Sequence, residues 1–393
     1  MNETIYAIWL SALKGMTPNR CYTLFNLFGS FTMIYESINI NFNQYFKINS
    51  RNPSLKQSDI VNHKKNLNKY EEYYYKILSK DIYVLTPLDD EFPDKLKEVI
   101  DCPITLYVKG NYKIPEFGIG IVGARRCSLY GKKVAKQFAK DLAAQGVNVI
   151  SGLAYGVDVA SHIGALENGG FTTAVLGGGL QACYPTKHQS IFEEITSKGC
   201  VISEEPYGKK TEPYMFPKRN RIISGMSHGV LVVEAAKKSG SLITVDFALE
   251  QGRDVFTVPG RLFDPLAEGT NNLIKQGAKI VYNYDDILSE FVDIFKKRKK
   301  KTDKIEKKLE EKEKIVYSCI SYDPVHEELL VKHIFETINL CMGALGEVND
   351  YSEDERNILN KMEESDIHLS LLTLELKGLI VKKSGCYYAR SEV

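Results

Sequence analysis

The stretch FGIGIVGARRCS, residues 117–128, decides the fold class of this chain. Its first seven residues form an apolar run that predicts a buried strand, and the run ends directly in alanine, two arginines and a serine. Further runs of this kind lie at 147–151, 172–177, 199–204, 229–235, 254–260 and 278–282. Helical segments separate them, so the pattern predicts an α/β fold with an extended Rossmann-like, doubly wound, mostly parallel sheet.

The bulk composition is that of an ordinary globular protein. The chain has 393 residues, of which 44% are hydrophobic and 26% charged, and its length predicts two or three domains. The eight cysteines include no C-x-x-C pair, which favours reduced thiols over a disulfide framework or a zinc site. Neither a signal peptide nor a membrane-length apolar run is recognisable, so we expect a cytoplasmic location and no membrane partner.

Composition changes along the chain predict four segments. Residues 1–75 have helical periodicity, and 80–294 hold the alternating strands and helices. Residues 295–314 form a basic linker, within which 296–314 has eleven Lys or Arg against five Asp or Glu, a net charge of +6. A solvated linker is the favoured interpretation, with phosphate contact as the alternative. Residues 315–393 end in a leucine-patterned helix, a glycine and two short β-like runs, the outline of a winged-helix-like domain.

The loops that follow the predicted strands are rich in glycine, serine and basic residues. In a parallel sheet these loops share the carboxyl edge, where such folds bind ligands. Arg125 and Arg126 provide donors in the first loop, and Ser239, Ser241 and Thr244 provide them in a later one. Each glycine alone can serve only a tight turn, but the loops together favour one anion-binding site.

The form of these loops disfavours the common nucleotide cofactors. The first loop lacks the G-x-G-x-x-G pattern of dinucleotide sites, and CSLYGKKV lacks the first glycine and the hydroxyl of a P-loop. Aromatic residues accompany the phosphate donors, a combination that suits single-stranded nucleic acid. These aromatics are Tyr155, Tyr184, Phe216 and Phe263.

The stretch EPYMFPKRNRIISG, residues 212–225, places three cations within four residues. Pro217 suits the first turn of a helix, in which Lys218 and Arg221 share one face and Arg219 lies on another. Cations this close repel one another unless an anion lies nearby, although a solvated basic turn is the simpler interpretation. Phe216 fits either base stacking or anchoring in the core.

No residue pattern points to catalysis, a metal site or a bound cofactor. His162 follows Asp158 by one helical turn, and this pair has either an acid–base role or, as we favour, a structural one. The chain contains no H-E-x-x-H motif. We therefore expect a binding protein and not an enzyme.

Six segments taken in order resemble the DprA/Smf family of DNA-processing proteins. They are GIVGARRCSLYG, VISGLAYGVDVASHIGAL, TAVLGGGLQACYP, FPKRNRIISGMS, VVEAAKKSGSLIT and VFTVPG with GTNNLIKQGA, all between residues 80 and 285. LKGMTPNRCYTLFNLFGS is similar to that family's helical SAM-like segment, close to a helix-hairpin-helix, and the C-terminal segment resembles its winged-helix domain. The resemblance implies that the chain binds and protects single-stranded DNA and loads a RecA-type recombinase during natural transformation. It also implies a homodimer.

The resemblance implies site residues as well, with the cations of 212–225 facing a phosphate backbone. His188 stands where the family usually has asparagine. With Lys218 added from the basic turn, the candidate DNA-binding residues are Gly123, Arg125, Ser128, Gly152, Phe216, Lys218, Arg219, Asn220, Arg221, Ser239, Gly240 and Ser241.

Two alternatives belong to other functional classes. The first is a nucleotide hydrolase of the LOG, or lysine-decarboxylase-like, phosphoribohydrolase type, which carries P-G-G-x-G-T-x-x-E. The comparable loop here, SGSLIT at 239–244, lacks that array. The second is a scaffold protein without a ligand.

Overall fold

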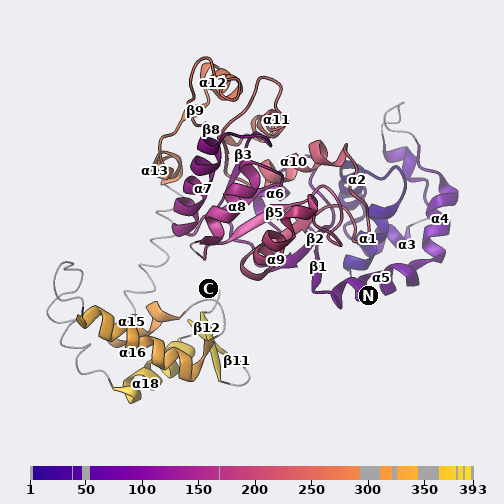
Figure 1. Ribbon diagram of the computed structural model, residues 1–393. Coiled ribbons are helices and arrows are strands. Elements are labelled where there is room, and N and C mark those ends of the chain that lie inside the picture. Colours follow the sequence, from indigo (N-terminus) through magenta and orange to yellow (C-terminus); the bar gives the residue numbers. More distant parts are fainter. Residues whose placement is uncertain are drawn as a thin grey trace. The chain divides into compact units, whose positions relative to one another are not determined.

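The chain forms two compact units, Met1–Glu290 and Phe291–Val393. The computed structural model describes residues 3–37, 39–46, 54–167, 169–292, 310–320, 325–343, 363–377, 379–383 and 386–390. Residues 295–309 of the predicted basic linker, 295–314, lie outside the described residues. Each unit is therefore described by itself (Figure 1).

A nine-stranded sheet organises the first unit, in the order β1-β2-β6-β5-β4-β3-β7-β8-β9. The seven strands predicted from the sequence are β3 to β9, and they pair in parallel as expected. Two antiparallel strands, β1 and β2, extend the sheet beside β6 and were not anticipated. The bounds are β1 Ile82–Leu85, β2 Leu106–Gly110, β3 Gly118–Val122, β4 Asn148–Ser151, β5 Thr172–Val175, β6 Cys200–Ser203, β7 Gly229–Val232, β8 Asp254–Thr257 and β9 Lys279–Ile280.

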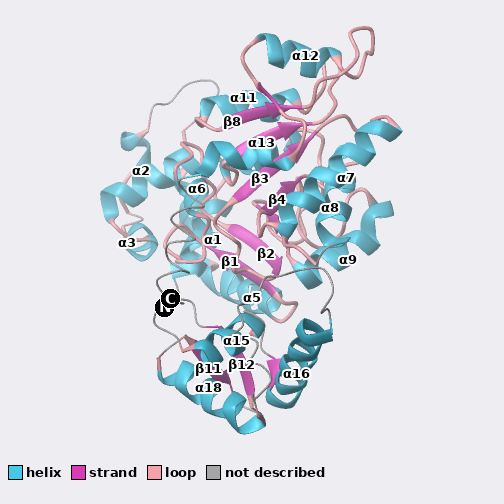
Figure 2. Ribbon diagram, turned by 90° about the vertical axis from the view of Figure 1, so that its left-hand side faces the viewer, coloured by secondary structure: helices cyan, strands magenta, loops and turns pink. Residues whose placement is uncertain are grey.

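Helices cover both faces of the sheet (Figure 2), as expected for a doubly wound fold. Successive strand residues point to opposite faces, so Val201 joins one core and Ile202 the other. Helices α8 and α9 supply Leu166, Phe192 and Ile195 to the first of these cores, and α7 packs along α8. Helices α10 and α11 supply residues to the second core. The bounds are α7 Leu129–Ala144, α8 Val157–Glu167, α9 Gln189–Lys198, α10 Met215–Gly225 and α11 Leu242–Glu250, with the shorter helices α6 Asp94–Lys97, α12 Glu268–Lys275 and α13 Tyr284–Leu288.

The N-terminal helices form a small core of their own and also pack on the sheet. Trp9, Phe31 and Phe42 are buried in this core. Ile8 and Ile77 belong to the same apolar cluster as the residues of β1 and β2, which explains why the helices and the sheet form one unit. The helices are α1 Glu3–Ala12, α2 Pro18–Phe28, α3 Phe31–Glu36, α4 Gln57–Lys65 and α5 Leu67–Leu78.

The second unit is a small helical core with a three-stranded antiparallel sheet of order β10-β12-β11. The leucine-patterned helix expected near the C-terminus is present as α18, and β11 and β12 follow it. Assignment to the winged-helix class stays a prediction. No helix in the described ranges is long and apolar enough to cross a membrane. The elements are α15 Glu311–Cys319, β10 Val325–His326, α16 Glu327–Gly343, α18 Glu364–Leu376, β11 Ile380–Lys383 and β12 Tyr387–Arg390.

Candidate functional site

A cavity of about 750 Å³ lies at the point where the order of the sheet reverses. From β3 the chain adds β4, β5 and β6 on one side, and it then returns to place β7 on the other side of β3. The loops after β3 and β7 are therefore neighbours at the carboxyl edge, the usual ligand site of doubly wound folds. Eight of the candidate residues line this cavity: Gly123, Arg125, Phe216, Arg219, Asn220, Ser239, Gly240 and Ser241.

One wall of the cavity is aromatic and carries an exposed cation. Phe216 is half-buried in the first turn of α10, one residue before Pro217, which lacks an N–H to lose in that turn. The guanidinium carbon of Arg125 lies 5.2 Å from the centroid of the Phe216 ring, within the range of a cation–π contact. The exposed ring of Tyr184 lies 5.6 Å from that of Phe216. This arrangement places the aromatic ring surface and the positive charge of Arg125 together at the opening of the cavity.

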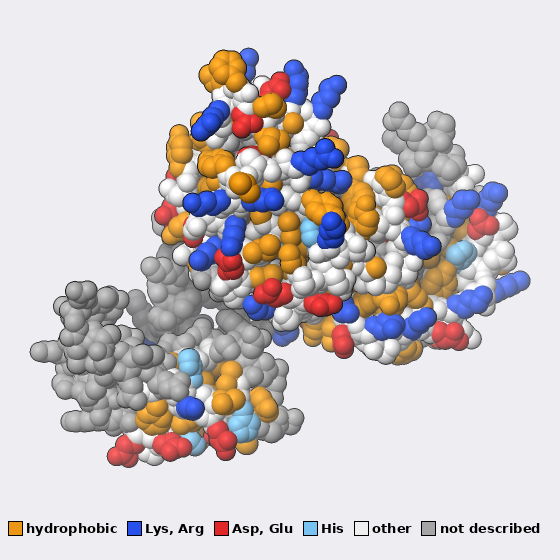
Figure 3. Space-filling view, viewed as in Figure 1, with side chains coloured by type: hydrophobic (Ala, Val, Ile, Leu, Met, Phe, Trp, Pro, Cys, Tyr) orange, Lys and Arg blue, Asp and Glu red, His pale blue; other side chains and the backbone are white. Residues whose placement is uncertain are grey.

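The cations at the rim of the cavity have no acidic partners among the residues that the structure describes. Arg125, Arg126 and Lys238 are exposed and line the cavity. Within the described ranges none of the three forms an ion pair. Lys and Arg side chains are frequent on the face of the first unit seen in Figure 3. The rim therefore has a positive potential that favours an anionic ligand.

Arg219 has a different place from the one its sequence suggested. Its side chain is buried and donates from Nη1 to the carbonyl oxygens of Gly152, at 2.8 Å, and Val175. A Cβ atom at Gly152 would lie 2.5 Å from the guanidinium, so any larger residue here would displace the Arg219 side chain. Burial lowers the pKa of Arg219 to about 10, which leaves it charged at neutral pH. Arg219 thus ties the ends of β4 and β5 to α10 beneath the cavity.

Lys218 and Arg221 face acids of the protein, which corrects the interpretation that the cations of α10 share an external phosphate. Arg221 is buried and donates from Nη2 to Glu204 at 2.7 Å and from Nε to Asp101 at 3.2 Å. Lys218 pairs with Glu204 at 3.0 Å and with Glu205 at 3.2 Å. The anions that relieve the repulsion within this turn therefore come from the loop after β6 and from Asp101.

Ser128 and Glu234 close the start of α7. The hydroxyl of Ser128 accepts a hydrogen bond from Gly131 N at 2.9 Å, a regular N-cap, and donates to Glu234 Oε1 at 2.5 Å. The Ser128 N–H donates to Glu234 Oε2 at 2.8 Å. A Cβ atom at Gly131 would lie 2.4 Å from the same carboxylate. Glu234 thus holds the place that a phosphate takes in dinucleotide-binding folds, and sequence reasoning had given it no partner.

The loop after β7 leaves space around its backbone, whereas the loop after β3 packs closely against neighbouring side chains. A Cβ atom at Gly240 would have no atom within 4 Å, so this backbone lies free at the cavity. The hydroxyls of Ser239 and Ser241 lie 2.7 Å apart. Gly123 differs, because a Cβ atom there would meet Val157 at 2.6 Å, so that glycine serves close packing.

Asp158, His162 and His188 have structural partners. Asp158 accepts from Gly152 N at 3.2 Å, and burial raises its pKa although Arg219 opposes the shift. His162 is fully buried, lies 2.8 Å from the hydroxyl of Thr172, and has a pKa lowered to about 3 by burial. His188 contacts the Leu153 carbonyl at 2.9 Å. Within the described ranges, no three His, Cys, Asp or Glu side chains form a possible metal site.

The part of the chain that forms this cavity is similar to known proteins. Residues 83–292 match the family model described as DNA recombination-mediator protein A. The chain belongs to this family. The DNA processing protein DprA of Streptococcus pneumoniae is 43% identical over 205 residues, which are 52% of this chain and 72% of that protein. The protein Smf of Escherichia coli is 44% identical over 207 residues, 52% of this chain and 55% of that protein.

A solved structure of the DNA recombination-mediator family has the same fold. The X-ray structure of DprA from Streptococcus pneumoniae is 32% identical, covers 74% of this chain and 98% of that chain, and has a TM-score of 0.63. The resemblance to DprA/Smf proteins and the mostly parallel α/β sheet are therefore confirmed.

Proposed function

We propose that the chain binds single-stranded DNA at the cavity between the loops after β3 and β7. The unpaired cations Arg125, Arg126 and Lys238 beside the half-buried Phe216 carry this proposal. Cations supply sequence-independent attraction to phosphates, and an open aromatic ring stacks on any base. Gly240 also lines the cavity, and the open space beside it lets a strand approach the backbone closely. Base edges are not read by such contacts, so binding tolerates many sequences.

Membership in a family of DNA-processing proteins supports a role in the recombination of incoming DNA. In this proposal the chain is a cytoplasmic homodimer that covers the strand against nucleases and delivers it to a RecA-type recombinase. It acts by binding and not by catalysis. Hydrolysis of nucleoside monophosphates by the purified chain would instead support the phosphoribohydrolase alternative.

A gel-shift titration tests the binding proposal directly. Single-stranded and double-stranded DNA of equal length are compared with the full chain at one fixed salt concentration. We expect tighter binding to the single strand, with affinity rising with length. Equal affinity for the two forms would contradict the proposal. Light scattering of the free protein tests the homodimer separately.

A further inference from the structure

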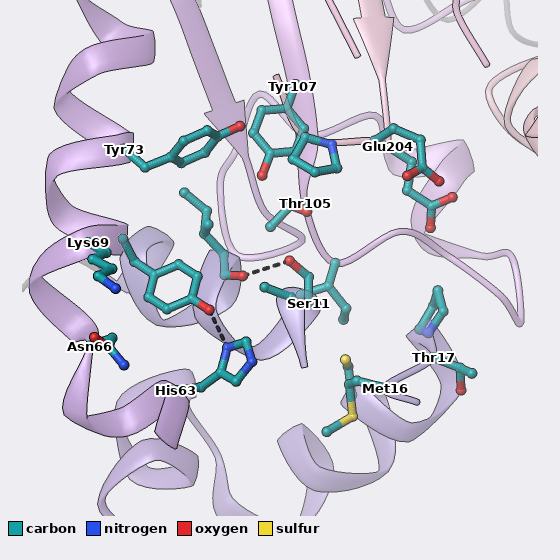
Figure 4. A pocket seen from close by; sticks show the side chains of 18 of the residues that line it. Ser11, Met16, Thr17, His63, Asn66, Lys69, Tyr73, Thr105, Tyr107 and Glu204 are labelled. Carbon is teal, nitrogen blue, oxygen red and sulfur yellow. Dashed lines mark hydrogen bonds between the residues drawn. The ribbon is translucent and has the colours of Figure 1, made fainter. Parts of the chain in front are cut away.

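A second hollow of about 580 Å³ lies on the other side of α10, between the N-terminal helices and the sheet. Lys218 lines this hollow, whereas Phe216, Arg219 and Asn220 line the cavity described above. Its other walls come from α1, α4, α5, the start of β2 and the loop after β6 (Figure 4). Its volume is within the range of small-molecule sites.

The body of this hollow suits a flat, apolar ring. Ile8, Met16 and Ile104 provide aliphatic surface, and the half-buried Tyr70 and Tyr73 provide aromatic surface. The hydroxyls of both tyrosines are already engaged by other residues of the protein. Tyr70 bonds to His63, and Tyr73 donates to the Tyr207 carbonyl at 3.3 Å. The tyrosine rings, and not their hydroxyls, are therefore available to a ligand.

The opposite end of the hollow carries two carboxylates, which are not equivalent. Both oxygens of Glu204 are used, one by Arg221 at 2.7 Å and the other by Lys218 at 3.0 Å. Glu205 uses Oε1 for Lys218 at 3.2 Å. Its Oε2 takes no hydrogen bond from any residue in the described part of the chain. Oε2 of Glu205 is therefore a free hydrogen-bond acceptor for a ligand in the hollow. The contact between Oε1 and Lys218 holds the carboxylate in place.

We propose that this hollow binds a planar, uncharged heterocycle that bears an amino group, as amino-bearing nucleobases do. The carboxylate of Glu205 accepts from an amino group but repels a carbonyl oxygen at the same position and any phosphate. The tyrosine wall stacks on the ring. The same chemistry is offered by a free nucleoside and by an unpaired base of a bound strand. The strand source rests on the proposed function, since α10, about 10–12 Å thick, separates this hollow from the cavity.

Two nucleosides that differ along the edge that carries the recognised group give the first test. Deoxycytidine has an amino group at C4 where deoxyuridine has an oxygen, and calorimetric titration of the full chain compares them. We expect deoxycytidine to bind about tenfold more tightly, because one hydrogen bond to a charged group changes to a repulsion. Equal binding, or no binding of either nucleoside, would overturn the proposal.

Variants show whether the hollow is where the nucleoside binds. Glu205→Gln keeps the shape but offers either a donor or an acceptor, so we expect the preference for deoxycytidine to fall to about twofold or less. Glu193→Gln, an exposed position on α9, is the matched control and should keep the full preference. Ala12→Trp fills the hollow from an exposed position of α1 and should abolish binding without lowering the melting temperature. An unchanged preference in Glu205→Gln, or binding retained in Ala12→Trp, would overturn the site.

A strand experiment separates the two sources. Thymidine oligomers with a single central dC or dU are compared by gel shift. Tighter binding of the dC oligomer, lost in Glu205→Gln, assigns the hollow to an unpaired base. Equal binding of the two oligomers, together with a deoxycytidine preference in calorimetry, assigns it to a free nucleoside. Failure of all single-strand binding would refute the proposed function and leave the nucleoside result standing.

Discussion

The two sides of α10 border cations that have opposite surroundings. On one side lies the cavity at the carboxyl edge of the sheet. Its rim cations, Arg125, Arg126 and Lys238, form no ion pair within the described ranges. On the other side, Lys218 and Arg221 are matched with Glu204, Glu205 and Asp101. The contrast teaches that the cations of the basic turn stabilise the protein, whereas the cations that remain available to a ligand lie on the loops after β3 and β7.

The largest expected effect concerns the matched face. Arg221→Ala leaves Glu204 without its strongest partner at a site where Arg221 itself is only 3% exposed. Loss of one member of a buried ion pair costs about 3–5 kcal/mol, so we expect the free energy of unfolding of the first unit to fall by that amount. Urea denaturation followed by circular dichroism measures it. A loss below about 1 kcal/mol would show that this face is not a structural one.

The next effect concerns ring contact on the cavity face. Phe216→Ala should weaken single-strand binding by about 1–3 kcal/mol, the worth of one stacked base, and leave the salt dependence unchanged. Fluorescence anisotropy with a labelled oligomer at several salt concentrations gives both quantities. If melting temperature falls strongly while the folded fraction binds normally, Phe216 is a core anchor and the stacking interpretation fails.

Charge on the cavity face gives a smaller and more specific effect. Arg125→Ala should make the slope of log affinity against log salt shallower by about 0.7, the contribution of one phosphate contact on a single strand. Its exposed position predicts little change in melting temperature. Arg126→Ala provides a neighbouring comparison of equal charge. An unchanged slope in both variants would move the phosphate contacts elsewhere.

The smallest effect is expected from Lys218, which makes it the sharpest control for the comparison. Its pair with Glu204 and Glu205 is partly exposed, and such pairs contribute about 0–1 kcal/mol to stability. Lys218→Ala should therefore change the salt slope by less than about 0.2, well under the contribution of one phosphate. A slope as shallow as that of Arg125→Ala would mean that Lys218 leaves its acids to contact phosphate.

Much of the fold was readable in the sequence because buried parallel strands form continuous apolar runs. All seven of those runs became strands of the sheet. Strands β1 and β2 were missed because Ile82–Leu85 and Leu106–Gly110 lie beside polar and charged stretches at the edge of the sheet. Their pairing is antiparallel, so no strand–helix alternation marks them.

The site was only partly readable, because proximity in sequence does not reveal partners in space. Arg125 and Gly240 line the cavity as expected from their loops. Arg221 could not be assigned correctly, since Asp101 and Glu204 approach it from distant parts of the chain. Glu234 is an acid near the end of the predicted strand 229–235, which was a usable signal, but its contact with Ser128 spans 106 residues.

The carboxylate at the start of α7 has a consequence for selectivity in a crowded cell. Mononucleotides and dinucleotide coenzymes are abundant there. Their phosphates usually bind at the N-terminus of the first helix of a doubly wound sheet. Here the carboxylate of Glu234 fills that place. We therefore expect the phosphates of these metabolites to be repelled at the start of α7. A ligand that is long enough to contact several rim residues of the cavity at once would still bind. Under the proposed function, we expect this carboxylate to favour binding of a polymer over binding of its monomers.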